Sequence, residues 1–545
     1  MTRPLLLSAC RTECQPAGLA RGDAVLSGFV GLLLLAATGC MVGPNFTRPS
    51  APTAPGWKNE GQGGIRAEPA EVSRWWEVFG DPVLSRLIET AYAQNLTLRV
   101  AGLRVLEAQA RRAIAIGSLF PQQQALTGSY TRTTLSANTA TPPFFGRDSN
   151  NWQAGFDAAW EIDVWGKFRR AIEASDADLL GAVASYDDVL VSLVAEVAAT
   201  YIRIRALDER LTVASDNVRV QRDSLEIARV RFESGGTSEL DVQQATTLLR
   251  DTEATIPQLE IELRQALDSL SVLLGTSPRE FADVLDEGGH VPQVPVTVAV
   301  GIPADLLRRR PDVRGAEQAA AAQSARIGVA QAELLPSFQL IGSIGLSAKD
   351  VANLFEGGSF QATTGPAFNW PLLNYGRLIN NVRLQDATFQ ELAVTYANTV
   401  LLAQRDVEDA LIGYLRGTEQ VQRLTESVAA ANRAVEISLV QYRQGATDFT
   451  SVLNTQQSKV HENDALVSTR GAVALSVIAL YKALGGGWEL REGHDFVSDD
   501  TRQELQARTA WGGLLSPAGP AGDVDAAPSD QETRSWWPWR WWPKW

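Results

Sequence analysis

The chain has 545 residues, of which 45% are hydrophobic, and this length is enough for more than one ordinary domain. Its formal net charge of −14 argues against a nucleic-acid-binding surface as the main function. The three histidines, His290, His461 and His494, share no ligand spacing, and there are only three cysteines, so the sequence predicts no metal site.

The first forty residues have the features of a bacterial export signal. Arg21 precedes an apolar run from Ala24 to Ala37, which is too short to span a membrane comfortably. A basic residue, an apolar core and the small residues of "AATGC" define a secretory signal. Because Cys40 stands directly after the expected cut site, the pattern resembles a lipobox, in which the cysteine thiol is acylated. We expect Cys40 to carry lipid; a plain signal or a stray buried cysteine is the alternative.

The rest of the chain contains an internal repeat. Residues 160–275 align with residues 370–485 at a constant offset of 210, which pairs "WEIDVWGKFRRAI" with "WPLLNYGRLINNV". Each copy predicts a helix, a proline, two strands, a glycine and two long helices joined by a turn. The predicted organisation is a signal peptide (residues 1–39), a lipid-anchored segment (40–83), a first copy (84–290), a linker (291–303), a second copy (304–490) and a flexible extension (491–545).

Apolar residues recur at every seventh position along the first long helix of each copy. A strict seven-residue repeat predicts a left-handed supercoil against neighbouring helices. The companion seam of the first copy is less regular, because Thr200 and Gln221 interrupt it. A helix from Lys167 to Phe232 would be about 100 Å long at about 1.5 Å per residue, which is longer than a compact globule needs. The two seams are Val183, Leu190, Val197, Ile204, Leu211, Val218, Leu225 and Phe232, and Ala393, Val400, Val407, Tyr414, Val421, Val428, Val435 and Tyr442.

Alternating segments predict four strands. Apolar side chains alternate with polar or small ones in residues 152–162, 338–346 and 360–370, and more weakly in residues 126–130. Strands of about eleven residues with one apolar face and aromatic ends are typical of outer-membrane barrels. A half-buried sheet in a soluble protein is the alternative. Four strands cannot close a barrel, and lipid does not tolerate an open sheet edge, so we expect several copies of the chain to close it.

Four segments resemble the TolC-like outer-membrane efflux proteins, in the lipoprotein branch that serves drug efflux systems of the resistance–nodulation–division (RND) type. They are "GCMVGPNFTRPSAP", "WWEVFGDPVLSRLIETAYAQNLTLRVAGLRVLEAQA", "GIPADLLRRRPDVRGAEQAAAAQSARIGVAQAELLPSF" and the "WG" junction, within residues 40–490. The resemblance implies a mainly α-helical chain with membrane β-strands. Three chains would form one twelve-stranded barrel continuous with a coiled-coil tunnel. The implied partners are a periplasmic adaptor and an inner-membrane RND-type transporter.

The resemblance also implies roles for particular residues. Gly166 and Gly376 would permit the turn from a membrane strand to a tunnel helix. The turns "FESGGTSELDV" and "YRQGATDFTSVL" would form the periplasmic tip, where the adaptor docks. There a glycine ends one helix and a threonine can cap the next. The residues are Gly235, Thr237, Gly445 and Thr447.

The resemblance places a gate at the same tip. In the family, links between inner and outer helix pairs hold the closed state, and Asp241 and Tyr442 occupy matching positions. Solvated turn residues are the alternative for both. Where relatives carry a leucine and then an acid, this chain has Thr450 and Asn454, so we expect no acidic ring there.

Together these patterns favour an export duct without catalysis of its own. The sequence has no phosphate loop, metal spacing or nucleophile–base constellation, so we expect no enzyme and no cofactor beyond the lipid on Cys40. The aromatic strands argue against a structural envelope tether. We expect an outer-membrane channel that extends into the periplasm and passively conducts drugs or other small molecules outward. A duct for type I protein secretion is the alternative. The end "SWWPWRWWPKW" suits a membrane interface or is a tail without function.

Overall fold

A computed structural model describes residues 41–515, apart from residues 60, 63, 67, 69–71, 139–145, 279–289 and 296. The predicted signal peptide, Cys40 and the tryptophan-rich tail lie outside the described residues. The described chain divides into two compact units. We call them the sheet unit, with residues 41–44, 116–171 and 326–383, and the helical unit, with residues 45–115, 172–325 and 384–515.

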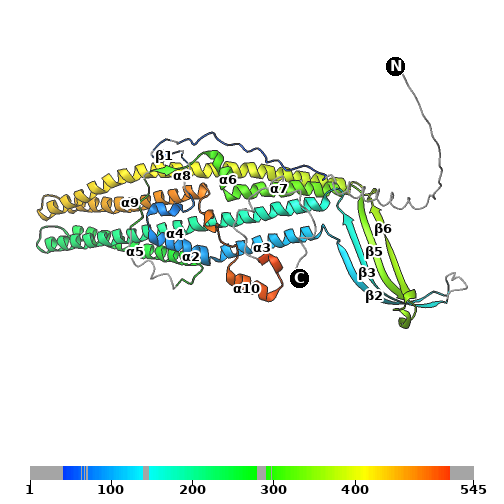
Figure 1. The fold of residues 1–545 in the computed structure, drawn as a ribbon. Coiled ribbons are helices and arrows are strands. Elements are labelled where there is room, and N and C mark those ends of the chain that lie inside the picture. The colour runs from blue at the N-terminus through cyan, green and yellow to red at the C-terminus, as the bar shows by residue number, and fades with distance from the viewer. Residues whose placement is uncertain are drawn as a thin grey trace, which may run out of the picture. The chain divides into compact units, whose positions relative to one another are not determined.

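The sheet unit contains one antiparallel sheet of four strands, which confirms the four predicted strands. Their order is β2 (Gln123–Thr134), β3 (Asp148–Ile162), β5 (Ser337–Ala348) and β6 (Phe360–Asn369), as Figure 1 shows. Within the part of the chain that the structure describes, β2 and β6 each have one unpaired edge. Large apolar side chains of the sheet are exposed in the single chain, including Leu126, Phe156, Ile344, Phe360 and Phe368. A sheet with unpaired edges and exposed apolar side chains needs a partner chain or a lipid environment.

Two pairs of long helices form most of the helical unit. α4 (Lys167–Glu233) is followed by α5 (Glu239–Leu273), and α8 (Arg377–Arg443) is followed by α9 (Phe449–Ala483) (Figure 1). α4 and α8 have 67 residues each, and α5 and α9 have 35 each. The prediction of two long helices joined by a turn in each copy is therefore confirmed, and α4 ends one residue beyond the predicted Phe232.

Shorter elements complete the chain. α2 (Pro82–Gln94) and α3 (Leu96–Gly117) precede β2, and α6 (Leu306–Arg309) and α7 (Pro311–Ala332) precede β5. β1 (Ile65–Arg66) pairs in parallel with β4 (Val298–Ala299), and α10 (Asp499–Arg508) follows α9. The 3-10 helices are η1 (Trp75–Phe79), η3 (Pro303–Asp305), η4 (Val351–Asn353), η5 (Gly357–Ser359), η6 (Trp488–Arg491) and η7 (Gly512–Leu515).

The seven-residue seams lie mostly in the core of the helical unit. Val197 of α4 and Val407 of α8 are fully buried, and the seams stay largely buried as far as Leu225 and Tyr442. Phe232 is the exception at 44% exposed, whereas Tyr442, at the matching position of α8, is 1% exposed. Burial of these apolar seams is the main force that holds the long helices together.

The C-terminal extension was predicted to be flexible from residue 491, and for residues 491–508 this prediction is wrong. Nε of Arg491 lies 2.7 Å from Oδ1 of Asp187, and both side chains are buried. The ring of Phe496 packs edge-on against Tyr186 with 5.2 Å between centroids. A Cβ at Gly102 would lie 1.9 Å from the carbonyl oxygen of Phe496, so the extension packs directly against α3. A buried ion pair and an aromatic contact therefore hold this segment despite its polar composition.

Polar side chains fasten the short helices to the ends of α5 and α9. Asn95, between α2 and α3, donates from Nδ2 to the carbonyl of Leu273 over 2.8 Å, and its Oδ1 accepts from the amide of Leu98 at 2.8 Å. Arg310, between α6 and α7, donates to the carbonyl of Ala483 over 3.0 Å. The last carbonyls of a helix have no partner within the helix, so these side chains satisfy groups that would otherwise be buried alone.

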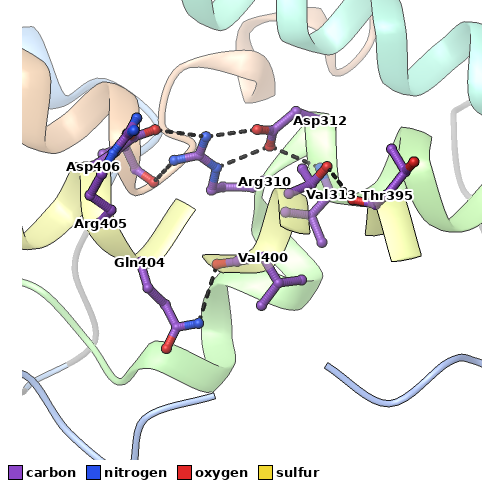
Figure 2. A network of polar contacts seen from close by, with 10 residues as sticks. Arg310, Asp312, Val313, Thr395, Val400, Gln404, Arg405 and Asp406 are labelled. Atoms are coloured by element: carbon purple, nitrogen blue, oxygen red, sulfur yellow. Dashed lines mark hydrogen bonds and ion pairs between the residues drawn. The ribbon is translucent and has the colours of Figure 1, made fainter. Parts of the chain in front are cut away.

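Arg310 makes further contacts, and Figure 2 shows them. Its Nε and Nη2 lie 3.0 and 2.7 Å from the carboxylate of Asp312, and Nη2 lies 3.4 Å from Asp406 of α8. One guanidinium therefore joins the start of α7, the middle of α8 and the end of α9. A Cβ at Gly485, whose φ is +74°, would lie 3.1 Å from Cα of Arg310, so the turn after α9 passes close to this cluster.

We predict that Asn95→Ala lowers the free energy of unfolding by about 2 kcal/mol. About half would come from the lost helix cap and about half from the unsatisfied carbonyl of Leu273. Thermal unfolding of the purified protein in mild detergent would measure this as a lower midpoint. Thr97→Ala is the control, because Thr97 is exposed two residues away. Equal midpoints for Asn95→Ala and Thr97→Ala would contradict the role of this contact.

Candidate functional site

The candidate site lies at the two turns that join α4 to α5 and α8 to α9. Gly235 and Gly445 both adopt a left-handed backbone, with φ of +74° and +75°. After each glycine, a backbone amide bonds to the carbonyl five residues earlier, at 2.7 Å for Gly236 to Arg231 and 2.9 Å for Ala446 to Gln441. This pattern closes a helix with a Schellman turn, which glycine favours because it has no Cβ.

Thr237 and Thr447 do not cap the helices that follow, so this part of the sequence analysis is wrong. The capping positions are Ser238 and Asp448, one residue later in each turn. Asp448 accepts from the backbone amide of Ser451, whereas Ser238 makes no side-chain cap. The threonine hydroxyls instead contact the side chain four residues on, Asp241 in the first turn and Ser451 in the second. A threonine one residue before the cap reaches side chains of the first helical turn in place of its amides.

Asp241 and Tyr442, predicted at matching positions, meet in the structure. The phenol of Tyr442 on α8 donates to Oδ2 of Asp241 on α5 over 3.0 Å. Tyr442 is only 1% exposed, and burial raises its pKa above the usual value near 10. The phenol therefore keeps its proton at neutral pH and can donate to the carboxylate. This hydrogen bond joins the first helix pair to the second.

Arg231 is a member of this site that the sequence analysis missed. Its guanidinium carbon lies 4.5 Å from the centre of the Tyr442 ring, and its Nη1 donates to the carbonyl of Tyr442. Its Nη2 donates to the carbonyl of Gly236 over 3.2 Å. The one signal in the sequence is a basic residue in the last turn of a helix, where the helix dipole favours positive charge. Arg229 has nearly the same position in the sequence, so spacing alone could not single out Arg231.

The link rests on a small apolar cluster, which we call the tip cluster. The ring of Phe449 packs edge-on against Tyr442 with 5.3 Å between centroids. Side chains from α4, α5, α8 and α9 all contribute, so the cluster ties the four helix ends together. Its buried members are Val218, Leu225, Ala228, Ala245, Leu249, Tyr442, Phe449 and Val452.

Thr450 and Asn454 lie on α9 directly after the second turn. Both side chains are exposed in the single chain, while Phe449 and Val452 between and beside them are buried. Residues four apart share one face of a helix, so Thr450 and Asn454 form a polar, uncharged face opposite the tip cluster. Among the described residues, no group of three or more His, Cys, Asp or Glu side chains could hold a metal ion.

The two strand-to-helix junctions lie in the sheet unit and share one backbone feature. Gly166 and Gly376 both have φ of +78°, which turns the chain from β3 into α4 and from β6 into α8. The first junction is covered by the N-terminal segment, since a Cβ at Gly166 would lie 2.7 Å from Cγ of Met41. At the second junction Tyr375 is 96% exposed in the single chain.

Comparison with known proteins agrees with this architecture. A family model described as "Outer membrane efflux protein" matches residues 87–276 and 302–486. The pyoverdine export outer membrane protein OpmQ of Pseudomonas putida is 32% identical over 460 residues, which are 81% of this chain and 94% of that protein. Nodulation protein T of Rhizobium leguminosarum bv. trifolii is 30% identical over 468 residues, or 84% of this chain and 96% of that protein.

The solved structure of the outer-membrane channel OprN has the same fold. It matches with a TM-score of 0.78 at 30% identity and covers 83% of this chain and 100% of the OprN chain. The resemblance to TolC-like efflux proteins is thereby confirmed, on the strands and long helices alike. The chain belongs to the outer membrane efflux protein family.

Proposed function

We propose that the protein is the outer-membrane channel of a tripartite efflux pump and passively conducts drugs or other small molecules from the periplasm to the outside. The observation that carries this proposal is the combination of elements in one chain. A four-stranded sheet with unpaired edges suits a membrane barrel, and helices about 100 Å long suit a conduit across the periplasm. The relatives include proteins described as efflux pump outer membrane proteins.

We infer that three chains close one twelve-stranded barrel. The unpaired edges of β2 and β6 support closure between copies, because unsatisfied backbone groups are costly in lipid. The internal two-fold repeat of the sequence is supported by the equal lengths of α4 and α8 and of α5 and α9. It is also supported by Asn95 and Arg310, which bind the last carbonyls of α5 and α9 from corresponding positions.

The implied partners are a periplasmic adaptor and an inner-membrane RND-type transporter. The two turns with Gly235, Thr237, Gly445 and Thr447 are the proposed adaptor contact, because they lie at the ends of the long helices. The Tyr442–Asp241 hydrogen bond, with Arg231 beside it, is the proposed latch that keeps the channel closed until the adaptor binds. The protein itself would supply no catalysis and no metal.

The function is tested by export and by mass. Deleting the gene from its host should increase retention of a fluorescent efflux dye, and the wild-type gene should restore export. Gly445→Val should fail to restore export although the protein still assembles, because a β-branched residue does not tolerate φ of +75°. Ala446→Val in the same turn is the control and should restore export.

The native mass in mild detergent should be that of three chains. A stable monomer with intact β-sheet signal would refute the barrel.

The lipid anchor is tested by labelling. Because Cys40 follows a signal-like segment, a palmitate analogue should label the wild-type protein and not Cys40→Ala. Cys10→Ala is a matched control, since Cys10 lies in the segment that we expect to be removed, and it should be labelled like the wild type. Equal labelling of Cys40→Ala and wild type would exclude acylation of Cys40.

The latch is tested by single-channel conductance in planar bilayers. Tyr442→Phe removes the hydrogen bond to Asp241, and Asp241→Ala removes its acceptor. A bond worth about 1 kcal/mol changes the ratio of open to closed states about fivefold in each chain. The wild type should conduct little and both variants more. Thr246→Val is the control, because the Thr246 hydroxyl bonds only within α5, to the carbonyl of Val242. Wild-type conductance in both latch variants would mean that this bond does not hold the channel closed.

A further inference from the structure

The buried apolar residues of the helical unit form two clusters. The larger, which we call the main cluster, reaches Ala214 on α4 and Leu259 on α5. The tip cluster begins at Val218 on α4 and includes Leu249 on α5. Ile256, which is only partly buried, packs against both clusters. The apolar packing of the long helices is therefore thin at one level between the tip and the rest of the bundle.

Buried amide side chains lie at this level and within the next two helical turns toward the tip. Asn217 and Gln221 of α4 and Gln456 of α9 are 3%, 2% and 2% exposed. Nε2 of Gln456 donates to Oγ of Ser224 over 2.6 Å. Within the described part of the chain, Nδ2 of Asn217, both amide atoms of Gln221 and Oε1 of Gln456 have no hydrogen-bond partner. Buried polar groups are normally satisfied, so these four atoms indicate a site for a polar ligand.

An open groove of about 710 Å³ adjoins Asn217. Asn217 lines it together with polar side chains of α5 and α9, which include Thr252, Thr255, Gln258 and His461. A polar space that is wider than one solvent molecule holds water, whereas an enclosed apolar space of the same size stays dry. The chemistry of the lining therefore selects water as the ligand.

The neighbouring stretch of α5 is weakened in its backbone. Pro257 lies inside α5 and has no N–H to donate to the carbonyl of Glu253. The hydroxyls of Thr252 and Thr255 donate to carbonyls of their own helix, at 3.1 Å to Leu248 and 2.8 Å to Thr252. An internal proline and such hydroxyl contacts are both associated with helix bending.

We propose that Asn217, Gln221 and Gln456 form a hydrated layer, filled by ordered water, at which the tip of the helical unit bends. Water can exchange hydrogen bonds as the helices shift, whereas packed methyl groups resist shear. The latch residues lie nearer the turns than this layer, since Arg231 and Tyr442 are in the last turns of α4 and α8 and Asp241 is in the first turn of α5. The tip would thus turn as one body when the latch opens. This role of the layer rests on the proposed channel function.

Hydrogen exchange of the purified full-length protein in detergent tests the layer directly. Amides at residues 216–222 of α4 and 252–258 of α5 should exchange at least tenfold faster than those at residues 197–204, which lie in the main cluster. Gln221→Met keeps the side-chain length and removes the unsatisfied amide. It should slow exchange in the layer at least threefold and raise the thermal midpoint. Gln422→Met, at an exposed position of α8, is the control and should do neither.

Uniform protection along α4 in the wild type would overturn the proposal, and this result does not depend on whether any variant folds. Faster exchange or a lower midpoint in Gln221→Met would overturn it as well.

The bending role is tested by adding Gln221→Met to the Tyr442→Phe channel, whose open probability should then fall severalfold. An unchanged open probability would show that the tip does not bend at this layer. If no variant conducts at all, the channel function fails, while the exchange data still decide whether the layer is hydrated and mobile.

Discussion

The bond between a side chain and the last carbonyls of a long helix is the constraint on which the helical unit depends. α5 and α9 end beside buried residues, since Leu274 and Leu484 are 0% and 3% exposed. Asn95 and Arg310 meet these carbonyls, and each stands immediately before a helix that leads toward a strand. The start of α3 is thereby fixed to the end of α5, and the start of α7 to the end of α9, by polar contacts that leave the apolar seams free to pack.

The two contacts differ in chemistry for a physical reason. Asn95 is neutral, and it also caps α3 through its other amide atom. Arg310 is charged and is surrounded by carboxylates, with Asp312 and Asp406 in contact and Asp188 in the same pocket. Burial, and next the nearby charge of Asp312, raise the pKa of Asp188 above its usual range. The guanidinium therefore offsets a concentration of negative charge that a neutral amide could not tolerate.

Periodicity was sufficient to predict the elements, and insufficient to predict most side-chain contacts. The seven-residue seams gave α4 to within one residue of its end, because burial of one helix face requires that spacing. Arg231 and Tyr442 are 211 residues apart, and Arg491 and Asp187 are 304 apart, so no local pattern reports that they meet. Thr237 and Thr447 were predicted to cap α5 and α9, but the capping residues lie one position later in the sequence. Composition cannot resolve a difference of one residue. Gln221, in contrast, was visible from sequence as a break in the companion seam.

The packing of the N-terminal segment determines where the proposed lipid would lie. The carbonyl of Val42 accepts from Nε of the buried Arg170 at 3.1 Å, and a Cβ at Gly328 would lie 2.8 Å from the same carbonyl oxygen. Residues 41–43 are therefore packed between α4 and α7 within the sheet unit. Under the proposed acylation, the lipid is attached one residue before this packed segment, within about 3.8 Å of backbone. The lipid would then hold the first strand-to-helix junction close to the membrane surface, because Met41 packs against Gly166.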